Sequence, residues 1–499
     1  MNSFDRVGSS NMGGPGDGLD GENARDWYEF EVLNNGEDTG ETRIRIKAYR
    51  QTSVPSFHEF VLDGPTHQAC LNLFDTIAAD LGTRVPLNRR PHQLPTFHGN
   101  FTRLLTENLS PDILYGYGDP AVIRTATKAG ETHFYAVVTS NDAPNSMPIL
   151  SSPDAKTWSL AGFVFPDGKQ PAWTAVGRGV ADFWAPEMHL VDGYFRVYFA
   201  ARQISTGSLA IGIASARSPE GPFSSEPVPL LRGDVIDPNV LMTCAGERFL
   251  FWKEDSNDRW PTLLTSLLHS NSRLISVLFV TEEDRRTAFL LEAMFGWIHS
   301  CGPMERFFLQ QVLIEAVSTD FLGFRSRLEN CLKVESDLSI CSIMGEVLRT
   351  VQTRVYGQRM SADGLSLIGE KSTVLQNDLA WEAHLIEGVW TVEERGKYYM
   401  FYAGNDFSTT EYGIGVAVAD APLGPYRKMP NQLLRSTAEW SGPGHPSVAR
   451  GLDGRPWLFF HAFFPGQVGY KQFRALLTLP IIYLEDGVRL ADPDNSLIS

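Results

Sequence analysis

Five stretches of the chain repeat one pattern of polar and apolar positions. Each stretch opens on a short segment with an acidic or Pro-flanked residue, passes through a Gly-containing turn and ends in a strand rich in Tyr, Phe, Trp and Leu. The predicted aromatic strands are 133–138, 194–199, 248–252, 397–403 and 456–460. Apolar runs bounded by Gly are typical of β-hairpins. Repetition of an all-strand unit predicts a propeller or a solenoid.

The repeat is interrupted once, between its third and fourth copies. The copies begin near residues 119, 185, 237, 387 and 445, so the intervals are 66, 52, 150 and 58 residues. In the long interval, residues 263–355 show helical periodicity, with helices predicted at 288–295 and 307–317. We expect an insert in a surface loop, because lengthening a loop costs little free energy. A retained intron would explain the same change in the character of the sequence over residues 263–355.

The segment before the repeats has a different character. Residues 1–25 are rich in Gly and polar residues and are predicted to be disordered. Residues 42–47 alternate as a strand, and residues 70–81 have helical spacing. The predicted division is therefore an N-terminal extension over 1–103, β-repeats over 104–262, a helical insert over 263–355 and β-repeats over 356–499.

Composition excludes several classes of partner. The net charge of −16 disfavours nucleic acids and anionic membranes. No run of about 18 apolar residues predicts a transmembrane helix, and the N-terminus lacks the apolar core of a signal peptide. We therefore expect a cytoplasmic protein by default, or a secreted one if the N-terminus is misassigned. The five cysteines are odd in number and lack metal-binding spacing, so a disulfide framework is not expected.

Three of the repeats carry a carboxylate at the start of the unit: Asp119, Asp237 and Glu387. If the units are blades of a propeller, the repeat brings these side chains to one mouth of the central channel. Converging acids shift one another's pKa. Glycoside hydrolysis needs such an arrangement, with one protonated carboxylic acid and one carboxylate that activates water. Either Asp-Pro alone could be a simple turn former.

The motifs Y-G-D-P-A-V-I-R, F-W-A-P-E-M, V-I-D-P-N-V, E-G-V-W and G-P-G-H-P-S-V, in this order, resemble glycoside hydrolase family 43. The resemblance covers about residues 104–490 without the insert. It implies a five-bladed β-propeller that acts on arabinose- and xylose-containing polysaccharides. By position it implies Asp119 as general base, Glu387 as general acid and Asp237 as the residue that tunes and orients the acid.

The resemblance also implies roles for residues around the three acids. Arg474 matches an arginine near the site, and His445 matches an axial histidine that could contact substrate or hold a structural calcium ion; no cofactor is required. Val389 stands after Glu-Gly where many members have Pro, which leaves the sugar specificity open. Candidates for sugar stacking, each equally suited to packing between blades, are Trp184, Trp260, Trp381 and Trp440. Of these we favour Trp184.

Three further polar residues have a structural interpretation. His189 and His384 are expected to be structural, and Asp182 is either a site residue or a strand cap.

The sequence therefore predicts an inverting glycosidase that removes α-L-arabinofuranosyl or β-D-xylosyl units. A non-catalytic carbohydrate-binding propeller, covered by the insert, and an endo-acting arabinanase remain as alternatives. A retaining, fructan-cleaving enzyme is disfavoured because its W-M-N-D-P-N-G and R-D-P signatures are absent.

Overall fold

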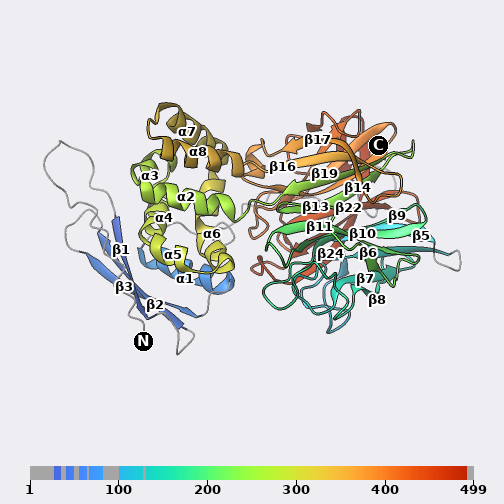
Figure 1. Ribbon diagram of the computed structural model, residues 1–499, viewed down its shortest axis with the longest axis horizontal. Helices are drawn as coiled ribbons and strands as arrows, with labels where there is room; N and C mark the ends of the chain where they lie inside the picture. Colours follow the sequence, from blue (N-terminus) through green and yellow to red (C-terminus); the bar gives the residue numbers. More distant parts are fainter. Residues whose placement is uncertain are drawn as a thin grey trace.

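The computed structural model describes residues 27–34, 41–49, 55–63, 67–81, 101–126 and 131–491. Figure 1 shows three parts side by side: a small N-terminal sheet, a group of helices, and a larger body of β-sheets. The residues predicted to be disordered, 1–25, lie outside the described part. Within the described part, no helix is long and apolar enough to cross a membrane.

Five antiparallel sheets make up the larger body, and each uses strands in their order along the chain. The first sheet contains β5 (Ala121–Ala126), β6 (Thr132–Val137), β7 (Ser146–Ser152) and β8 (Ser159–Phe165). The second contains β9 (Trp184–Val191), β10 (Tyr194–Arg202), β11 (Leu209–Ala216), β12 (Ser224–Ser225) and β13 (Leu231–Arg232). The third contains β14 (Val235–Met242), β15 (Arg248–Glu254), β16 (Arg354–Met360) and β17 (Leu367–Gln376).

The remaining two sheets complete the body. The fourth contains β18 (Ile386–Glu394), β19 (Lys397–Gly404), β20 (Gly413–Ala419) and β21 (Arg427–Lys428). The fifth contains β22 (Ser441–Arg450), β23 (Pro456–Phe463), β24 (Arg474–Leu484) and β25 (Gly487–Leu490), and β4 (Thr102–Leu105) pairs with β24. The five predicted aromatic strands are confirmed as β6, β10, β15, β19 and β23.

The first strands of the five sheets contact one another in cyclic order. β5 contacts β9, β9 contacts β14, β14 contacts β18, β18 contacts β22, and β22 contacts β5. Each first strand pairs with the second strand of its own sheet so that its start lies beside the second strand's end: Val235 opposite Glu254, Ile386 opposite Gly404, and Ser441 opposite Phe463. We call this end of the sheets the N-terminal face, because all first strands begin there.

A helical segment connects β15 to β16 and therefore emerges from the N-terminal face of the third sheet (Figure 1). The sequence specifies several helix starts: Asp337 caps α8 through the N–H groups of Ser339 and Ile340, and Thr281 caps α4. The predicted helix 307–317 is confirmed within α6; the predicted helix 288–295 overlaps α4 but runs past its end at Ala293 into the start of α5. The helices are α2 (Arg259–Ser270), α3 (Arg273–Leu278), α4 (Glu282–Ala293), α5 (Phe295–Ser300), α6 (Pro303–Thr319), α7 (Phe321–Val334) and α8 (Leu338–Thr350).

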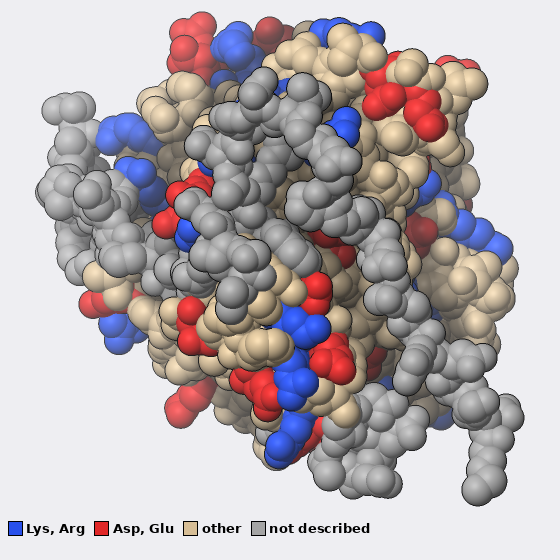
Figure 2. Space-filling model, turned by 90° about the vertical axis from the view of Figure 1, so that its left-hand side faces the viewer, with Lys and Arg blue, Asp and Glu red and all other residues tan. Residues whose placement is uncertain are grey.

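The N-terminal sheet consists of β1 (Trp27–Asn34), β2 (Glu41–Tyr49) and β3 (Ser56–Asp63), followed by α1 (His67–Leu81). The predicted strand and helix are confirmed as β2 and α1. Alternation along β2 buries Ile44 and Ile46, and turns Arg45 toward Glu31 and Glu59. Figure 2 shows this side of the molecule, where basic and acidic side chains are interspersed.

The buried faces of the N-terminal sheet and of the helices belong to one hydrophobic core. It joins Ile44 and Phe60 of the sheet and Ile77 of α1 to apolar residues such as Leu313 of α6 and Leu291 of α4. α1 packs on α6, and β1 packs on α4. The predicted segments 1–103 and 263–355 therefore contribute to a single packed unit, which we call the α/β cap.

The α/β cap rests on connections of the N-terminal face. Gln311 of α6 donates a hydrogen bond of 2.7 Å to Ser408, which lies between β19 and β20. Ser318 lies 3.2 Å from Nδ1 of His384, just before β18, and Phe308 packs on Tyr470 with ring centroids 5.8 Å apart. The cap thus covers part of the face at the third, fourth and fifth sheets.

Candidate active site

The three predicted carboxylates lie together at the N-terminal face. Asp119 precedes β5, Asp237 lies in β14, and Glu387 lies in β18. Asp237 interacts electrostatically with both of the others. All three are largely buried; the side chains of Asp119 and Glu387 retain 13% and 11% of their exposure. The acids therefore meet at one site that still reaches solvent.

The backbone identifies the equivalent position in each repeat. Asp119, Ala185, Asp237, Gly388 and His445 all have positive φ, between 41° and 57°. Pro follows four of these residues, and Val389 follows Gly388. The prediction that all three acids occupy the same position is therefore wrong by one residue: Glu387 precedes the equivalent position. Non-Gly residues in this region are strained, and such strain is typical of functional sites.

Asp119 is held as a carboxylate by cationic and neutral donors. Arg474 donates a hydrogen bond of 2.7 Å to Oδ1, and Thr139 donates one of 2.5 Å to Oδ2. Burial acts to raise the pKa of Asp119, but Arg474, His445 and Thr139 together hold it well below its usual range. Gly118 provides the space, since a Cβ there would lie 1.8 Å from the guanidinium carbon of Arg474.

Two histidines flank the same carboxylate in different ways. Nδ1 of each lies 3.4 Å from Oδ1 of Asp119. The backbone N–H of Asp119 donates to Nδ1 of His461 at 3.1 Å, so this nitrogen carries no proton. Burial and Arg474 also hold the pKa of His461 well below its usual range. His461 is therefore a neutral acceptor, and His445 is the histidine able to face Asp119 with a proton.

Asp237 and Glu387 have the opposite tendency. Burial raises the pKa of Asp237, and His445 and Lys253 offset this only in part. Burial also raises the pKa of Glu387, against the opposing ammonium of Lys253, and the charge of Asp237 raises it further. Asp237 accepts a 2.8 Å hydrogen bond from the backbone N–H of Gly388, next to Glu387. The site thus separates Asp119, which stays ionised, from the interacting pair of Asp237 and Glu387, which tends to hold one proton.

Sequence reasoning missed four residues that touch these acids: Thr139, Lys253, Tyr412 and His461. The hydroxyl of Tyr412 donates a 2.8 Å hydrogen bond to Oε1 of Glu387, and Nζ of Lys253 lies 3.2 Å from Oε2. A signal existed for Lys253 and His461, because each is a polar residue inside an apolar strand, F-L-F-W-K and L-F-F-H-A-F. Tyr412 and Thr139 lie in connections and carried no such signal.

The predicted substrate-binding residues fall into two groups. His445 and Arg474 are brought to Asp119, as described above. Trp184 opens β9, is partly exposed, and donates a 2.9 Å hydrogen bond from Nε1 to Asn141. Its contact with a sugar stays a prediction.

Three other stacking candidates are packed elsewhere. Trp260 is wrong as a stacking candidate, because it is 1% exposed in the core of the α/β cap. Trp440 is buried against Phe464, and Trp381 stacks on Tyr402 within the fourth sheet.

The remaining polar candidates have structural partners. His189 bonds to Glu187 at 2.9 Å and stacks on Trp390. Burial lowers the pKa of His384 to about 4, although Asp406, 3.5 Å away, opposes this. Asp182 forms a 2.8 Å ion pair with Arg202. These contacts support structural roles for all three.

The residues near His445 do not fit a metal site. Among the described residues, no group of three or more His, Cys, Asp or Glu side chains is arranged to hold an ion. Calcium takes six to eight oxygen ligands, and His445 instead faces Asp119. We derive no step through a metal.

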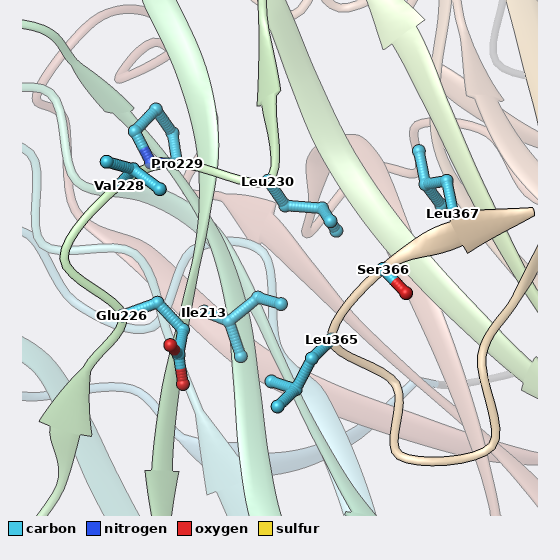
Figure 3. A pocket seen from close by; sticks show the side chains of 8 residues that line it. All are labelled: Ile213, Glu226, Val228, Pro229, Leu230, Leu365, Ser366 and Leu367. Carbon is cyan, nitrogen blue, oxygen red and sulfur yellow. The ribbon is translucent and has the colours of Figure 1, made fainter.

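A pocket of about 310 Å³ lies elsewhere, between the second and third sheets (Figure 3). None of the three carboxylates lines it. Its walls are Ile213, Glu226, Val228, Pro229, Leu230, Leu365, Ser366 and Leu367.

Comparison with known proteins agrees with this site. A curated relative, the Xylosidase/arabinosidase 43A of Humicola insolens, is 23% identical over 304 residues, 61% of this chain and 73% of that protein. A Beta-xylosidase of Xylanibacter ruminicola is 29% identical over 100 residues, 20% of this chain and 30% of that protein. A solved thermostable family-43 glycoside hydrolase matches with a TM-score of 0.52 and 21% identity, covering 80% of this chain and 98% of that one.

The sequence model described as Glycosyl hydrolases family 43 matches residues 113–275 and 340–489, more than half of the chain. It leaves 276–339 unmatched, which is most of the helical segment. The match spans Asp119, Asp237 and Glu387. The chain therefore belongs to glycosyl hydrolase family 43.

Proposed function

We propose that this glycosidase removes α-L-arabinofuranosyl or β-D-xylosyl units from oligosaccharides or polysaccharides, with inversion at the anomeric carbon. Family membership makes a carbohydrate the substrate. The names of two relatives, a xylosidase/arabinosidase and a beta-xylosidase, support pentose units. We also propose that the five sheets are the blades of a β-propeller. The cyclic contacts of the first strands and the pairing of β4 with the last sheet support this.

One arrangement carries the mechanism: Arg474 donates to Asp119 at 2.7 Å, whereas Glu387 is buried beside Asp237, and these surroundings lower the pKa of Asp119 and raise that of Glu387. Asp119, kept ionised by Arg474, is suited to take a proton from water as general base. Glu387, kept protonated by burial, is suited to protonate the leaving oxygen as general acid. Asp237 holds the N–H of Gly388 and adds negative charge, so it keeps the acid protonated and oriented.

The purified protein should hydrolyse aryl α-L-arabinofuranosides or aryl β-D-xylosides. Glu387→Ala should lose about 10²–10⁴-fold on poor leaving groups and much less on activated ones, which need little protonation. Asp119→Ala should be slow on all of them, and azide should restore some rate by replacing activated water. Proton NMR of the first product should show the inverted anomer. A retained anomer would rule out Asp119 as the base.

A carbohydrate-binding protein without catalysis is the competing function, because the α/β cap covers part of the N-terminal face. The residual exposure of Asp119 and Glu387 favours an enzyme, since the cap does not seal the acids from solvent. Sugar binding by calorimetry together with no turnover of any aryl pentoside would establish the competing function.

A further inference from the structure

Lys253 is a charged side chain buried inside the candidate active site. It lies in β15, where it pairs with Ile236 of β14 and Val355 of β16, and it is 1% exposed. Its Nζ is 3.2 Å from Oε2 of Glu387 and 3.8 Å from Oδ1 of Asp255. Nζ makes no hydrogen bond of good geometry in the described part of the chain. A buried, incompletely bonded ammonium is costly and needs an explanation.

The surroundings keep this lysine charged. Burial acts to lower the pKa of Lys253, but the acidic side chains of Glu387, Asp255 and Asp237 outweigh it and hold the pKa above its usual value. When Glu387 carries its proton, Asp255, 3.8 Å from Nζ, and Asp237 still supply negative charge. The side chain is too deeply buried to contact a sugar directly. Its influence on the reaction must therefore pass through its neighbours, of which Glu387 is nearest.

The contacts of Glu387 assign different tasks to its two oxygens. An ammonium has only donors, so Lys253 is best matched by the carboxyl oxygen without a proton, and it faces Oε2. The hydroxyl of Tyr412 donates to Oε1 of the ionised carboxylate at 2.8 Å and can also accept when that oxygen is protonated. The proton of a protonated Glu387 is therefore favoured on Oε1, with the Tyr412 hydroxyl turned to accept. When that proton leaves, the new negative charge develops beside the ammonium.

We propose that Lys253 is a positioning residue for this reaction: its buried ammonium keeps the acid proton of Glu387 on the Tyr412 side and stabilises the carboxylate formed when that proton is donated. The proposal rests on the proposed role of Glu387 as general acid. Lys253 itself stays protonated throughout, and the proton moves from Glu387 to the leaving oxygen.

Groups other than Lys253 also act on the pKa of Glu387. Asp237 of β14 raises its pKa, whereas Lys253 of β15, Tyr412 of the β19–β20 connection and His445 of β22 lower it. Lys253 is the largest of the lowering influences. Its removal should therefore make Glu387 a weaker acid.

The test compares Lys253→Met, which keeps the length of the side chain, with Lys253→Arg, which keeps the charge. In Lys253→Met, the alkaline limb of the kcat/KM profile should move to higher pH. The kcat for poor leaving groups should fall about 10-fold or more, with little loss on activated substrates and little change in KM. Lys253→Arg should keep the limb near that of the wild type. Lys397→Met, an exposed lysine paired with Asp420, is the control for loss of a charge.

A second variant, Asp255→Asn, tests the same role and can be measured even if Lys253→Met does not fold. Asp255→Asn removes the other carboxylate near Nζ, so the ammonium should act more fully on Glu387 and the alkaline limb should move to lower pH. Opposite shifts in the two variants cannot come from general destabilisation. An unmoved limb in both, in an enzyme where Glu387→Ala still shows its dependence on leaving group, would overturn the role of Lys253 and leave the proposed function intact. Loss of that dependence would instead overturn the role of Glu387.

Discussion

Asp237 occupies the middle of the carboxylate site. It accepts the N–H of Gly388 and raises the pKa of Glu387 through its charge. In Asp237→Asn the amide oxygen can still accept this hydrogen bond, but the charge is lost. We expect a lower rate and an alkaline limb of kcat/KM displaced to lower pH, because Glu387 then ionises more readily. Asp420→Asn, on an exposed residue, should leave the profile unchanged; an unmoved limb in Asp237→Asn would show that Asp237 does not modulate the acid.

Gly388 allows two parts of the site to approach closely. Its φ is +57°, and a Cβ there would lie 2.8 Å from Nδ1 of His445. Gly388→Ala should cost roughly 1–2 kcal/mol from backbone strain and should also displace His445, so kcat should fall. Gly396→Ala is the matched control, since its φ is +76° with open space around the position. The control should lose stability in thermal unfolding but keep kcat; equal kcat in both variants would contradict the contact with His445.

Much of the site could be predicted at the level of single residues, and the rest could not for a physical reason. The repeated pattern led to Asp119, Asp237 and Glu387, and each lies at the N-terminal face. The one-residue offset of Glu387 was hidden, because φ cannot be read from a sequence and Gly388 lacks the Pro that marks the other copies. Tyr412 and Thr139 lie in connections between strands, where the sequence has no regular pattern from which the direction of a side chain could be predicted.

At the level of strands, one buried amide joins three sheets. Asn239 of β14 donates a 2.8 Å hydrogen bond to Glu187 of β9 and accepts one of 2.9 Å from the N–H of Thr391 of β18. Asn239→Ala would leave both partners without this bond in a buried site. We expect the free energy of unfolding to fall by about 2–4 kcal/mol, measured by urea denaturation. Asn330→Ala, on an exposed residue, should change it by no more than about 0.5 kcal/mol.

The same amide offers a test that depends on pH. Burial raises the pKa of Glu187, more than His189 and Asn239 lower it. Asn239→Asp would place a second carboxylate beside it and raise that pKa further. A carboxyl whose folded pKa lies above its unfolded pKa loses stability as pH rises between them. Asn239→Asp should therefore be most destabilised at neutral pH and recover in mild acid, whereas Asn239→Ala should show less of this recovery.

Strands and helices were predictable where their periodicity was strong. The aromatic strands and the helix within α6 appear at the expected positions, and the other predicted helix overlaps α4, because local burial patterns determine them. The outer strands β12, β13 and β21 have two residues each and left no pattern to read.

For the whole molecule, the α/β cap is the feature that the sequence did not reveal. Along the sequence, the N-terminal sheet and the helices are separated by the first two sheets and part of the third. Hydrophobic periodicity is a local pattern and cannot predict a contact between segments so far apart. The helix caps and the shared core also favour a genuine protein segment over a retained intron.

The shared core leads to a prediction about deletions. Replacing residues 263–355 alone should expose the apolar face of the N-terminal sheet and give an aggregating protein. Removing 1–100 together with 259–350 should give a soluble protein with β-type circular dichroism, because Lys253 and Val355 are paired neighbours that a short linker can join. Size-exclusion chromatography distinguishes the two. A monodisperse single deletion would show that the N-terminal sheet does not depend on the helices.

The α/β cap also dictates an order of events during synthesis. The ribosome makes β1–β3 and α1 before the five sheets, yet α4 and α6, the helices that bury their apolar side, begin about 200 and 220 residues after α1 ends. At roughly 5–20 residues per second, the early strands wait on the order of ten seconds for their partners. During that interval the nascent chain carries an unsatisfied hydrophobic surface, while the first two sheets can already form. Chaperone capture of ribosome-bound chains should therefore begin early and end only when α6 has emerged.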